Sequence, residues 1–222
     1  MSFEKMLING LHKGLGTWAE SPQAFTVARN GGAESAIRAQ LLYDLESETD
    51  CFAFTESDRA RIDVTLRPKR APTESVCLLE LKHNFLHSAQ IRYIKGSLDG
   101  APRQLTKADV AEGDVDARYY LHLIVELCRT LQKRPRNHSL VATHDHMVPG
   151  YKRFGIPRES IESTTALLGD VERILGTHYA RYPIKQDRRD LSGHATLYCW
   201  LYSVSKDGKR KPVKNFATVS PK

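Results

Sequence analysis

Two short segments on either side of a proline-containing turn constrain this chain more than any other feature. Residues 61–67 and 76–82 are rich in apolar and β-branched side chains, and the polar stretch 68–75 between them contains two prolines. This pattern predicts an antiparallel hairpin. In a hairpin that is symmetric about the middle of this turn, Asp63 lies opposite Glu80, with Cβ atoms about 5 Å apart.

Lys82 is expected on the same face as Glu80, because strand side chains alternate with a period of two. Two carboxylates and one amine on one sheet face can hold a hard divalent cation and orient a water molecule against a phosphodiester. The alternative is a solvated ion pair across the two strands. The apolar residues 77–81 around Glu80 favour the first interpretation, because a carboxylate there is costly without a metal ion or a partner.

Hydrophobic and polar periodicity predicts the other elements. The predicted helices span residues 2–17, 33–46, 100–111 and 157–175, and the other predicted strands span residues 51–55, 119–128, 139–143, 178–184 and 195–204. Residues 85–100 have no clear pattern, Pro102 suits a first helical turn, and the basic tail 206–215 is expected to be flexible. A short buried helix is the alternative for residues 119–128. This order predicts an α/β fold in which a mixed sheet with an N-terminal β-meander is flanked by helices.

The order of the acidic residues resembles the PD-(D/E)XK nuclease superfamily, which has the restriction-endonuclease-like fold. The resemblance covers about residues 33–127. In that family a helix with a glutamate precedes a β-meander, one strand of the meander carries an aspartate, the next carries Glu-x-Lys, and a helix and a strand follow. Glu34, Asp63 and Glu80-Leu81-Lys82 match these positions in order.

The resemblance implies catalytic roles for Glu34, Asp63, Glu80 and Lys82. Gln104 matches more loosely a glutamine on the following helix of several branches, and Ile62 replaces the proline that gives the motif its first letter. Asp63, Glu80 and the main-chain carbonyl of Leu81 would hold Mg²⁺ or Mn²⁺, because the donors are all oxygen. Lys82 would position or deprotonate the nucleophile, or stabilise the developing charge. Arg38 is expected to be an i, i+4 partner of Glu34.

The chain has 222 residues, of which 41% are hydrophobic and 27% charged, as in ordinary globular proteins. We expect one α/β domain over residues 1–222, with a catalytic core at about 30–145 and a strand-rich basic part at about 150–222. No apolar run approaches the length of a membrane span, and the N-terminal segment lacks the features of a signal peptide. Scattered cysteines without a CxxC pair indicate reduced thiols, so a cytoplasmic location without membrane association is expected.

Late basic residues suggest how a polyanion would bind. The net charge is +7, and Arg181, Lys185, Arg188 and Arg189 are candidate contacts to nucleic-acid phosphates. The alternative is that these charges only solvate the edge of the sheet. Together with the basic charge, the resemblance implies a Mg²⁺- or Mn²⁺-dependent DNA endonuclease or exonuclease, as a homodimer if it cuts both strands, in restriction, phage defence or DNA repair. A nucleic-acid-binding protein without catalysis is the non-enzyme alternative.

A second cluster lies at His144-Asp145-His146. In a strand the two histidines would share a face and could bind a transition metal. A polar loop after a strand is the favoured interpretation, because no third ligand follows at a recognisable spacing. A phosphoesterase that uses this cluster is the alternative enzyme class.

Overall fold

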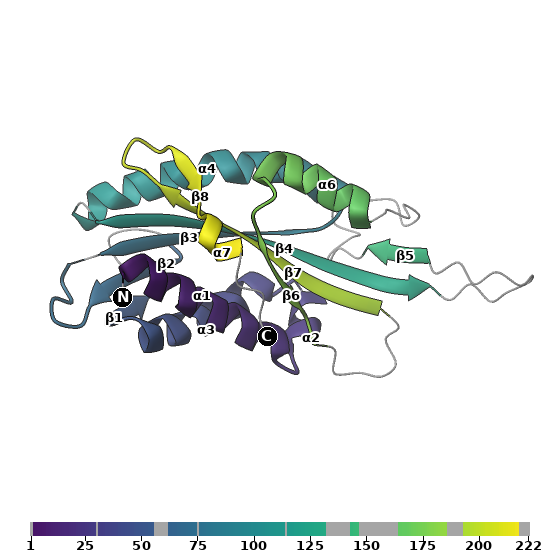
Figure 1. Ribbon diagram of the computed structural model, residues 1–222, viewed down its shortest axis with the longest axis horizontal. Helices are drawn as coiled ribbons and strands as arrows, with labels where there is room; N and C mark the ends of the chain where they lie inside the picture. The colour runs from purple at the N-terminus through teal and green to yellow at the C-terminus, as the bar shows by residue number, and fades with distance from the viewer. Residues whose placement is uncertain are drawn as a thin grey trace, which may run out of the picture.

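A mixed β-sheet with helices on both faces forms the molecule (Figure 1). The computed structural model describes residues 2–29, 31–55, 62–74, 76–113, 115–131, 143–146, 164–185 and 193–217. The strands are β1 (Cys51–Phe54), β2 (Val64–Pro68), β3 (Cys77–Phe85), β4 (Ala117–Leu131), β5 (Thr143–His146), β6 (Ala180–Pro183), β7 (Gly193–Val204) and β8 (Arg210–Pro212). Their order is β1-β2-β3-β4-β7-β6, with β5 paired to β4 and β8 paired to β7.

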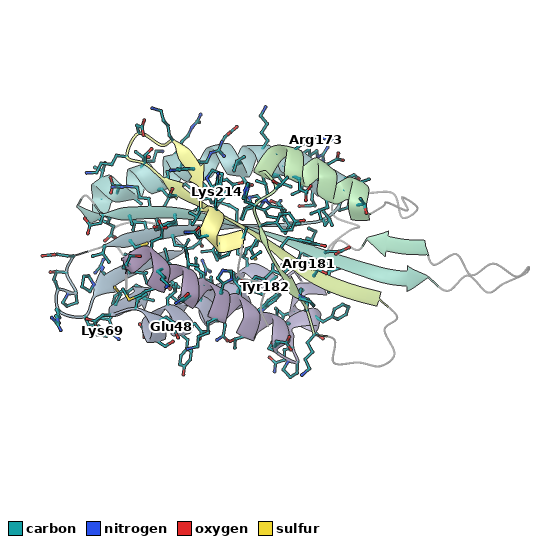
Figure 2. All side chains as sticks on the ribbon, in the orientation of Figure 1. Glu48, Lys69, Arg173, Arg181, Tyr182 and Lys214 are labelled. Carbon is teal, nitrogen blue, oxygen red and sulfur yellow. The ribbon has the colours of Figure 1, made fainter. Side chains whose placement is uncertain are left out.

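Two helical layers cover the sheet. The helices are α1 (Phe3–Glu20), α2 (Ala24–Arg29), α3 (Ala33–Glu48), α4 (Ser88–Glu112), α6 (Thr164–Leu175) and α7 (Lys214–Ala217). Helices α1 to α3 lie on one face of the sheet, and α4 and α6 lie on the other (Figure 1). In Figure 2, Glu48 on α3 and Arg173 on α6 mark the outer surfaces of the two helical layers. None of the described helices combines the length and the apolar character that a membrane span requires.

Strand alternation creates two hydrophobic cores. Leu79 and Leu81 of β3 pack with the apolar faces of α1 and α3, while Leu78 packs with α4 and α6. Helices α1 and α3 approach closely at Gly14, where a Cβ atom would lie 2.8 Å from Leu41 Cδ2. Close packing of this kind fixes α3 against α1, and α3 carries two residues of the candidate site.

The predicted hairpin register is confirmed. Strands β2 and β3 are antiparallel, with Val64 opposite Leu79 and Leu66 opposite Cys77. Ladder pairing begins at Val64, so Asp63 lies one residue before β2 and next to Glu80 in the same register. Strand β4 follows through α4 and runs parallel to β3. The order is therefore a helix, an antiparallel meander, a crossover helix and a parallel central strand, as expected for a mixed α/β fold.

Helix α4 is longer than the sequence predicts. It spans 25 residues, includes most of the unassigned segment 85–100, and contains Pro102 in its interior rather than its first turn. Proline removes the N–H that would bond to the carbonyl four residues earlier. That carbonyl belongs to Leu98, and it accepts a hydrogen bond from the Arg210 guanidinium. A residue of β8 thus replaces the donor that Pro102 removes.

Two further predictions differ from the structure, and one helix was missed. The tail is not an irregular segment, because β8 pairs with β7 and α7 buries Phe216. His144, Asp145 and His146 lie in β5, paired with β4, rather than in a loop. The short helix α2 was not predicted. Residues 139–142 of one predicted strand and residues 157–163 of one predicted helix lie outside the described residues, while residues 119–128 form a strand within β4.

Candidate carboxylate and lysine site

Asp63 is held by a strand and a helix at once. Its Oδ2 accepts a hydrogen bond from the backbone N–H of Leu81 at 2.8 Å, and its Oδ1 accepts one from Arg38 Nη1 at 2.7 Å. The first bond joins the start of β2 to β3, and the second joins it to α3. Arg38 therefore pairs with Asp63, a contact that was not expected from the sequence. Its charge also acts on Glu34, the expected i, i+4 partner.

Glu80 and Lys82 complete the central group. Lys82 Nζ donates to Glu80 Oε1 in an ion pair along one face of β3. The Glu80 side chain is only 2% exposed, whereas that of Lys82 is 29% exposed. The carboxylate is therefore buried in the sheet while the ammonium group reaches the surface. The structure brings Asp63, Glu80 and Lys82 together as the hairpin register predicted.

Glu34 lies at the first turn of α3 and is half-buried. Burial raises the pKa of its carboxyl group above the usual value, and the negative charge of Asp63 raises it further, while Lys82 and Arg38 lower it. These interactions place Glu34 within electrostatic reach of the same group. It thus forms an outer acidic residue of the site.

The Glu80 carboxyl group is electrostatically strained. Burial raises its pKa to about 7, the neighbouring Asp63 adds to the rise, and the hydrogen bond from Lys82 opposes it. Its Oε2 atom is buried and has no hydrogen-bond partner in the part of the chain that the structure describes. A buried carboxylate oxygen without a partner is unfavourable. A cation at this oxygen would relieve that cost.

The donor set suits a hard cation. Asp63 and Glu80 supply carboxylate oxygens, and Leu81, whose backbone N–H binds Asp63 Oδ2, follows Glu80 directly on β3. Across the described ranges, no group of three or more His, Cys, Asp or Glu side chains is arranged to hold a metal ion. An ion here would therefore keep several water ligands, which is the usual behaviour of Mg²⁺.

A buried polar chain runs beside the site on β4, and the sequence analysis missed it. In the parallel ladder Tyr120 lies opposite Glu80 and His122 opposite Lys82. The Tyr120 hydroxyl is hydrogen-bonded to His122 Nδ1, and His122 Nε2 contacts Asn84 Oδ1 at 3.1 Å. Burial, together with the charge of Lys82, lowers the pKa of His122 to about 3. His122 is therefore neutral.

The hydrogen bonds that link Tyr120, His122, Asn84 and Gln90 all have their donor on the Tyr120 side and their acceptor on the Gln90 side. Because Asn84 Oδ1 can only accept, the proton of His122 is on Nε2, and Nδ1 accepts from Tyr120. The Asn84 amide then donates to Gln90 Oε1 at 3.4 Å. Gln90 lies in the first turn of α4, so the chain leads from β4 to the start of the helix that follows β3. The signal that the sequence offered was His122, a polar residue within the apolar run 119–125.

The structure does not place Gln104 with the carboxylates. It is exposed on α4, and at 1.5 Å per residue it lies about 24 Å along the helix from Ser88. Gln90 is the α4 glutamine that is close to β3. Among the expected phosphate contacts, Arg181 is exposed on β6, with its guanidinium 5.8 Å from the centre of the Tyr198 ring, and Lys185 is also exposed. Arg188 and Arg189 lie outside the described residues.

Fold and site together define a class of protein: a mixed α/β protein in which a buried glutamate, a partly buried aspartate and a lysine meet at the junction of a meander and two helices. Comparisons with protein-family models, with curated proteins and with solved structures found no match.

Three of the four cysteines, Cys51, Cys77 and Cys199, are buried free thiols.

The raised pKa of Glu80 predicts a pH-dependent stability difference. A carboxyl group with a folded-state pKa near 7 and an unfolded value near 4.5 destabilises the fold when it ionises, so stability falls as pH rises between these values. We expect Glu80→Gln, in EDTA, to raise the free energy of unfolding by about 1–3 kcal/mol at pH 8. Near pH 4 the difference should vanish.

Urea unfolding at the two pH values measures this difference. The control is Glu74→Gln, because Glu74 is exposed in the turn between β2 and β3, and it should change little at either pH. A Glu80→Gln protein that is less stable than the parent at pH 8 would contradict the expected effect.

Proposed function

We propose that this chain is a metal-dependent nuclease with a restriction-endonuclease-like core. The observation that carries the proposal is the buried Glu80 carboxylate, whose Oε2 has no partner among the described residues, beside Asp63 and Lys82. The order of α3, the antiparallel β1 to β3, α4 and the parallel β4 supports the same conclusion. Glu34 in the first turn of α3, Asp63 just before β2 and Glu80-Leu81-Lys82 on β3 support it further, because the resemblance expects a glutamate, an aspartate and Glu-x-Lys in this order.

Asp63, Glu80 and the carbonyl of Leu81 would hold Mg²⁺ or Mn²⁺. When bound, such an ion lowers the pKa of a water molecule and offsets negative charge on a phosphoryl oxygen. The orphaned Glu80 oxygen and the all-oxygen donor set fit this group. The ion would also favour the ionised form of Glu80, whose pKa burial otherwise raises.

The protein residues around the site provide rigidity and positive charge. The Leu81 N–H and the Arg38 guanidinium hold both oxygens of Asp63, so its orientation is set before a substrate arrives. Lys82, held by Glu80 and partly exposed, can place its ammonium group against a phosphate and stabilise the charge that develops there. Glu34 supplies further negative charge at the edge of the site.

The test is a cleavage assay with linear, circular and single-stranded DNA and with RNA, each in Mg²⁺, Mn²⁺ or EDTA. We expect DNA hydrolysis with either metal and none in EDTA. Cleavage of circular DNA would identify an endonuclease. Undiminished cleavage in EDTA would exclude the proposed site, and binding without hydrolysis under every metal would leave the nucleic-acid-binding alternative in its place.

A further inference from the structure

The outer face of α4 carries a row of basic side chains that extends along the helix, away from the end that lies near the carboxylate site. Arg92, Lys95, Arg103 and Lys107 are all exposed, and their spacing places them on the side of the helix opposite to its buried residues. We call these four residues the basic stripe. At 1.5 Å per residue the stripe is about 22 Å long. It begins near Gln90 and ends at the far end of α4.

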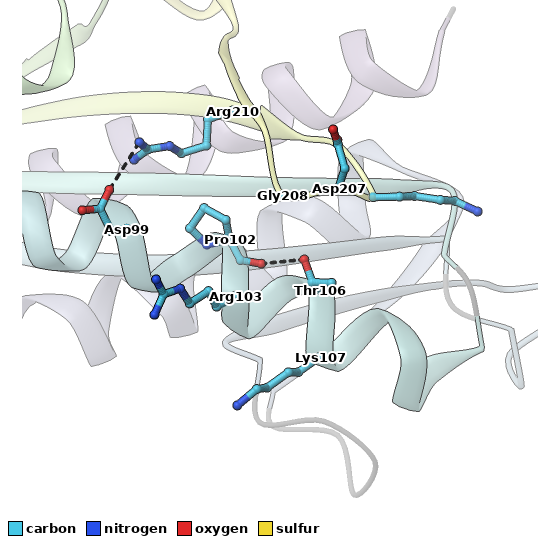
Figure 3. A pocket seen from close by; sticks show the side chains of 9 residues that line it. Asp99, Pro102, Arg103, Thr106, Lys107, Asp207, Gly208 and Arg210 are labelled. Atoms are coloured by element: carbon cyan, nitrogen blue, oxygen red, sulfur yellow. Dashed lines mark hydrogen bonds and ion pairs between the residues drawn. The ribbon is translucent and has the colours of Figure 1, made fainter.

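A pocket of about 680 Å³ lies at the far end of the stripe (Figure 3). It is lined on one side by α4 and on the other by the β7–β8 hairpin; its residues are Asp99, Pro102, Arg103, Thr106, Lys107, Lys206, Asp207, Gly208 and Arg210. The hairpin turn packs closely there, because Gly208 adopts a φ of +78° and a Cβ atom on it would lie 3.9 Å from Pro102 and Thr106. Figure 3 shows Arg103 and Lys107 pointing to the same side of α4.

The charges of the pocket divide into paired and available groups. Asp99 faces Arg210 at 3.6 Å, and Asp207 pairs with Lys209 at 2.7 Å. Arg210 also donates to the Leu98 carbonyl, so its role is to hold the hairpin on α4. Arg103 and Lys107 make no hydrogen bond or ion pair with any residue that the structure describes. They are the two cations of the pocket that remain available for an external anion.

Two glycines lie between the cations of the stripe. Gly96 and Gly100 have open space where a Cβ atom would be, although an interior glycine costs a helix about 1 kcal/mol relative to alanine. Without side chains at these positions, an extended anionic chain can approach the helix backbone closely. The helix backbone is therefore accessible at these two positions within the stripe, and Asp99, which faces Arg210, lies between Lys95 and Arg103.

We propose that the basic stripe and the pocket bind the phosphates of a nucleic-acid backbone away from the cleavage position. This inference rests on the proposed function and names the path that the substrate follows. Phosphates on one strand of B-form DNA are about 3.4 Å apart along the axis, so the stripe spans about six nucleotides. A linear array of exposed cations fits a polymer, whereas a small anion is held by groups that converge on one point.

The test compares two double charge reversals in an Asp63→Asn background, which prevents turnover during binding measurements. Arg103→Glu with Lys107→Glu removes the cations of the pocket, and Lys5→Glu with Lys214→Glu makes the same charge change on α1 and α7, which pack against the opposite face of the sheet. All four side chains are exposed, so both proteins should unfold like their parent.

Fluorescence anisotropy with a labelled duplex at several salt concentrations is the measurement. We expect the first double variant to reduce the slope of log K against log salt by about two and to weaken binding at least tenfold at low salt. The control should change the slope by well under one. On duplexes too short to reach from the carboxylate site to the pocket, the first variant and its parent should bind alike.

Equal, small effects of the two double variants would overturn the inference, even if the wild-type protein cleaves DNA with Mg²⁺. If inorganic phosphate or a free nucleotide binds in a way that needs Arg103 and Lys107, while DNA binding does not need them, the pocket is a small-anion site and the inference also fails. If Arg103→Glu with Lys107→Glu reduces the salt slope as expected but the wild-type protein never cleaves DNA, the inference stands and the proposed nuclease activity fails. The two failures are therefore distinguishable.

Discussion

Replacing Asp63 by asparagine or Glu80 by glutamine is expected to reduce DNA cleavage about a thousandfold or more. Each change keeps the shape of the side chain and removes one anionic oxygen donor from the proposed cation site. A bound metal ion contributes several kcal/mol to the stabilisation of transition-state charge, and each 1.36 kcal/mol corresponds to a tenfold change in rate. Single-turnover cleavage in Mg²⁺, with enzyme in excess, measures the loss.

DNA binding separates this effect from damage to the fold. Asp63→Asn keeps one side-chain oxygen, which can replace only one of the two acceptors that the Leu81 N–H and Arg38 use. The variant should nevertheless bind DNA as tightly as the parent or more tightly, because a negative charge near the phosphate has been removed. Glu74→Gln, in the exposed turn, should cleave normally. Normal cleavage by both site variants, with activity lost in His144→Ala and His146→Ala, would instead favour a phosphoesterase that uses the β5 cluster.

The largest loss of stability is expected from Asp109→Ala. Asp109 and Arg118 are both buried and form an ion pair between the end of α4 and the start of β4. Asp109 Oδ1 also accepts from the Val115 N–H at 2.9 Å, and Arg118 Nη2 donates to the Val115 carbonyl at 2.7 Å. Removing one partner of a buried pair leaves an uncompensated charge and costs about 3–5 kcal/mol.

Urea unfolding tests this expectation against a matched surface pair. Asp170 and Arg173 form an ion pair on α6 whose side chains are 43% and 77% exposed, so Asp170→Ala should change the free energy of unfolding by less than about 1 kcal/mol. Asp109→Asn keeps an oxygen acceptor and should lie between the two. A loss of less than 1 kcal/mol for Asp109→Ala would show that Arg118 finds other compensation.

Local features of this fold were predictable from the sequence. The turn between β2 and β3 sets the hairpin register, so Asp63 and Glu80 could be paired before any tertiary contact was known. Lys82 followed from strand alternation. Helix α3 was equally clear, because hydrophobic periodicity depends only on neighbouring residues. The apolar run 119–128 indicated a buried strand but left a short buried helix as the alternative.

Features that depend on distant contacts were not predictable. The sequence suited Pro102 to a first helical turn and gave residues 85–100 no clear pattern, whereas in the structure Arg210 binds the Leu98 carbonyl that Pro102 leaves without a donor, and α4 continues through both residues. The tail became ordered because β8 pairs with β7. Gln104 was chosen because the start of α4 was placed too late; with the helix beginning at Ser88, Gln90 takes the position near β3.

The chain of hydrogen bonds from Tyr120 to Gln90 required the parallel pairing of β3 with β4. The register between β3 and β4 determines which residues of β4 lie opposite Glu80 and Lys82. Because α4 separates the two strands in sequence, no local pattern gives that register. The polar residues of the hairpin were therefore found from the sequence, whereas their neighbours on β4 were found only in the structure.

The pairing of β4 with β7 has a consequence for how the chain reaches this fold. Arg129 lies opposite Gly193, and Tyr119 lies opposite Ser203. One edge of β4 therefore pairs with residues of β7 that come more than sixty positions later in the sequence. Contacts this distant in sequence form slowly. Until β7 arrives, the apolar β4 presents an open edge that other chains can pair with. We therefore expect pairing of β4 with other chains to compete with correct folding until β7 has been made, and β7 to end that competition when it pairs with β4.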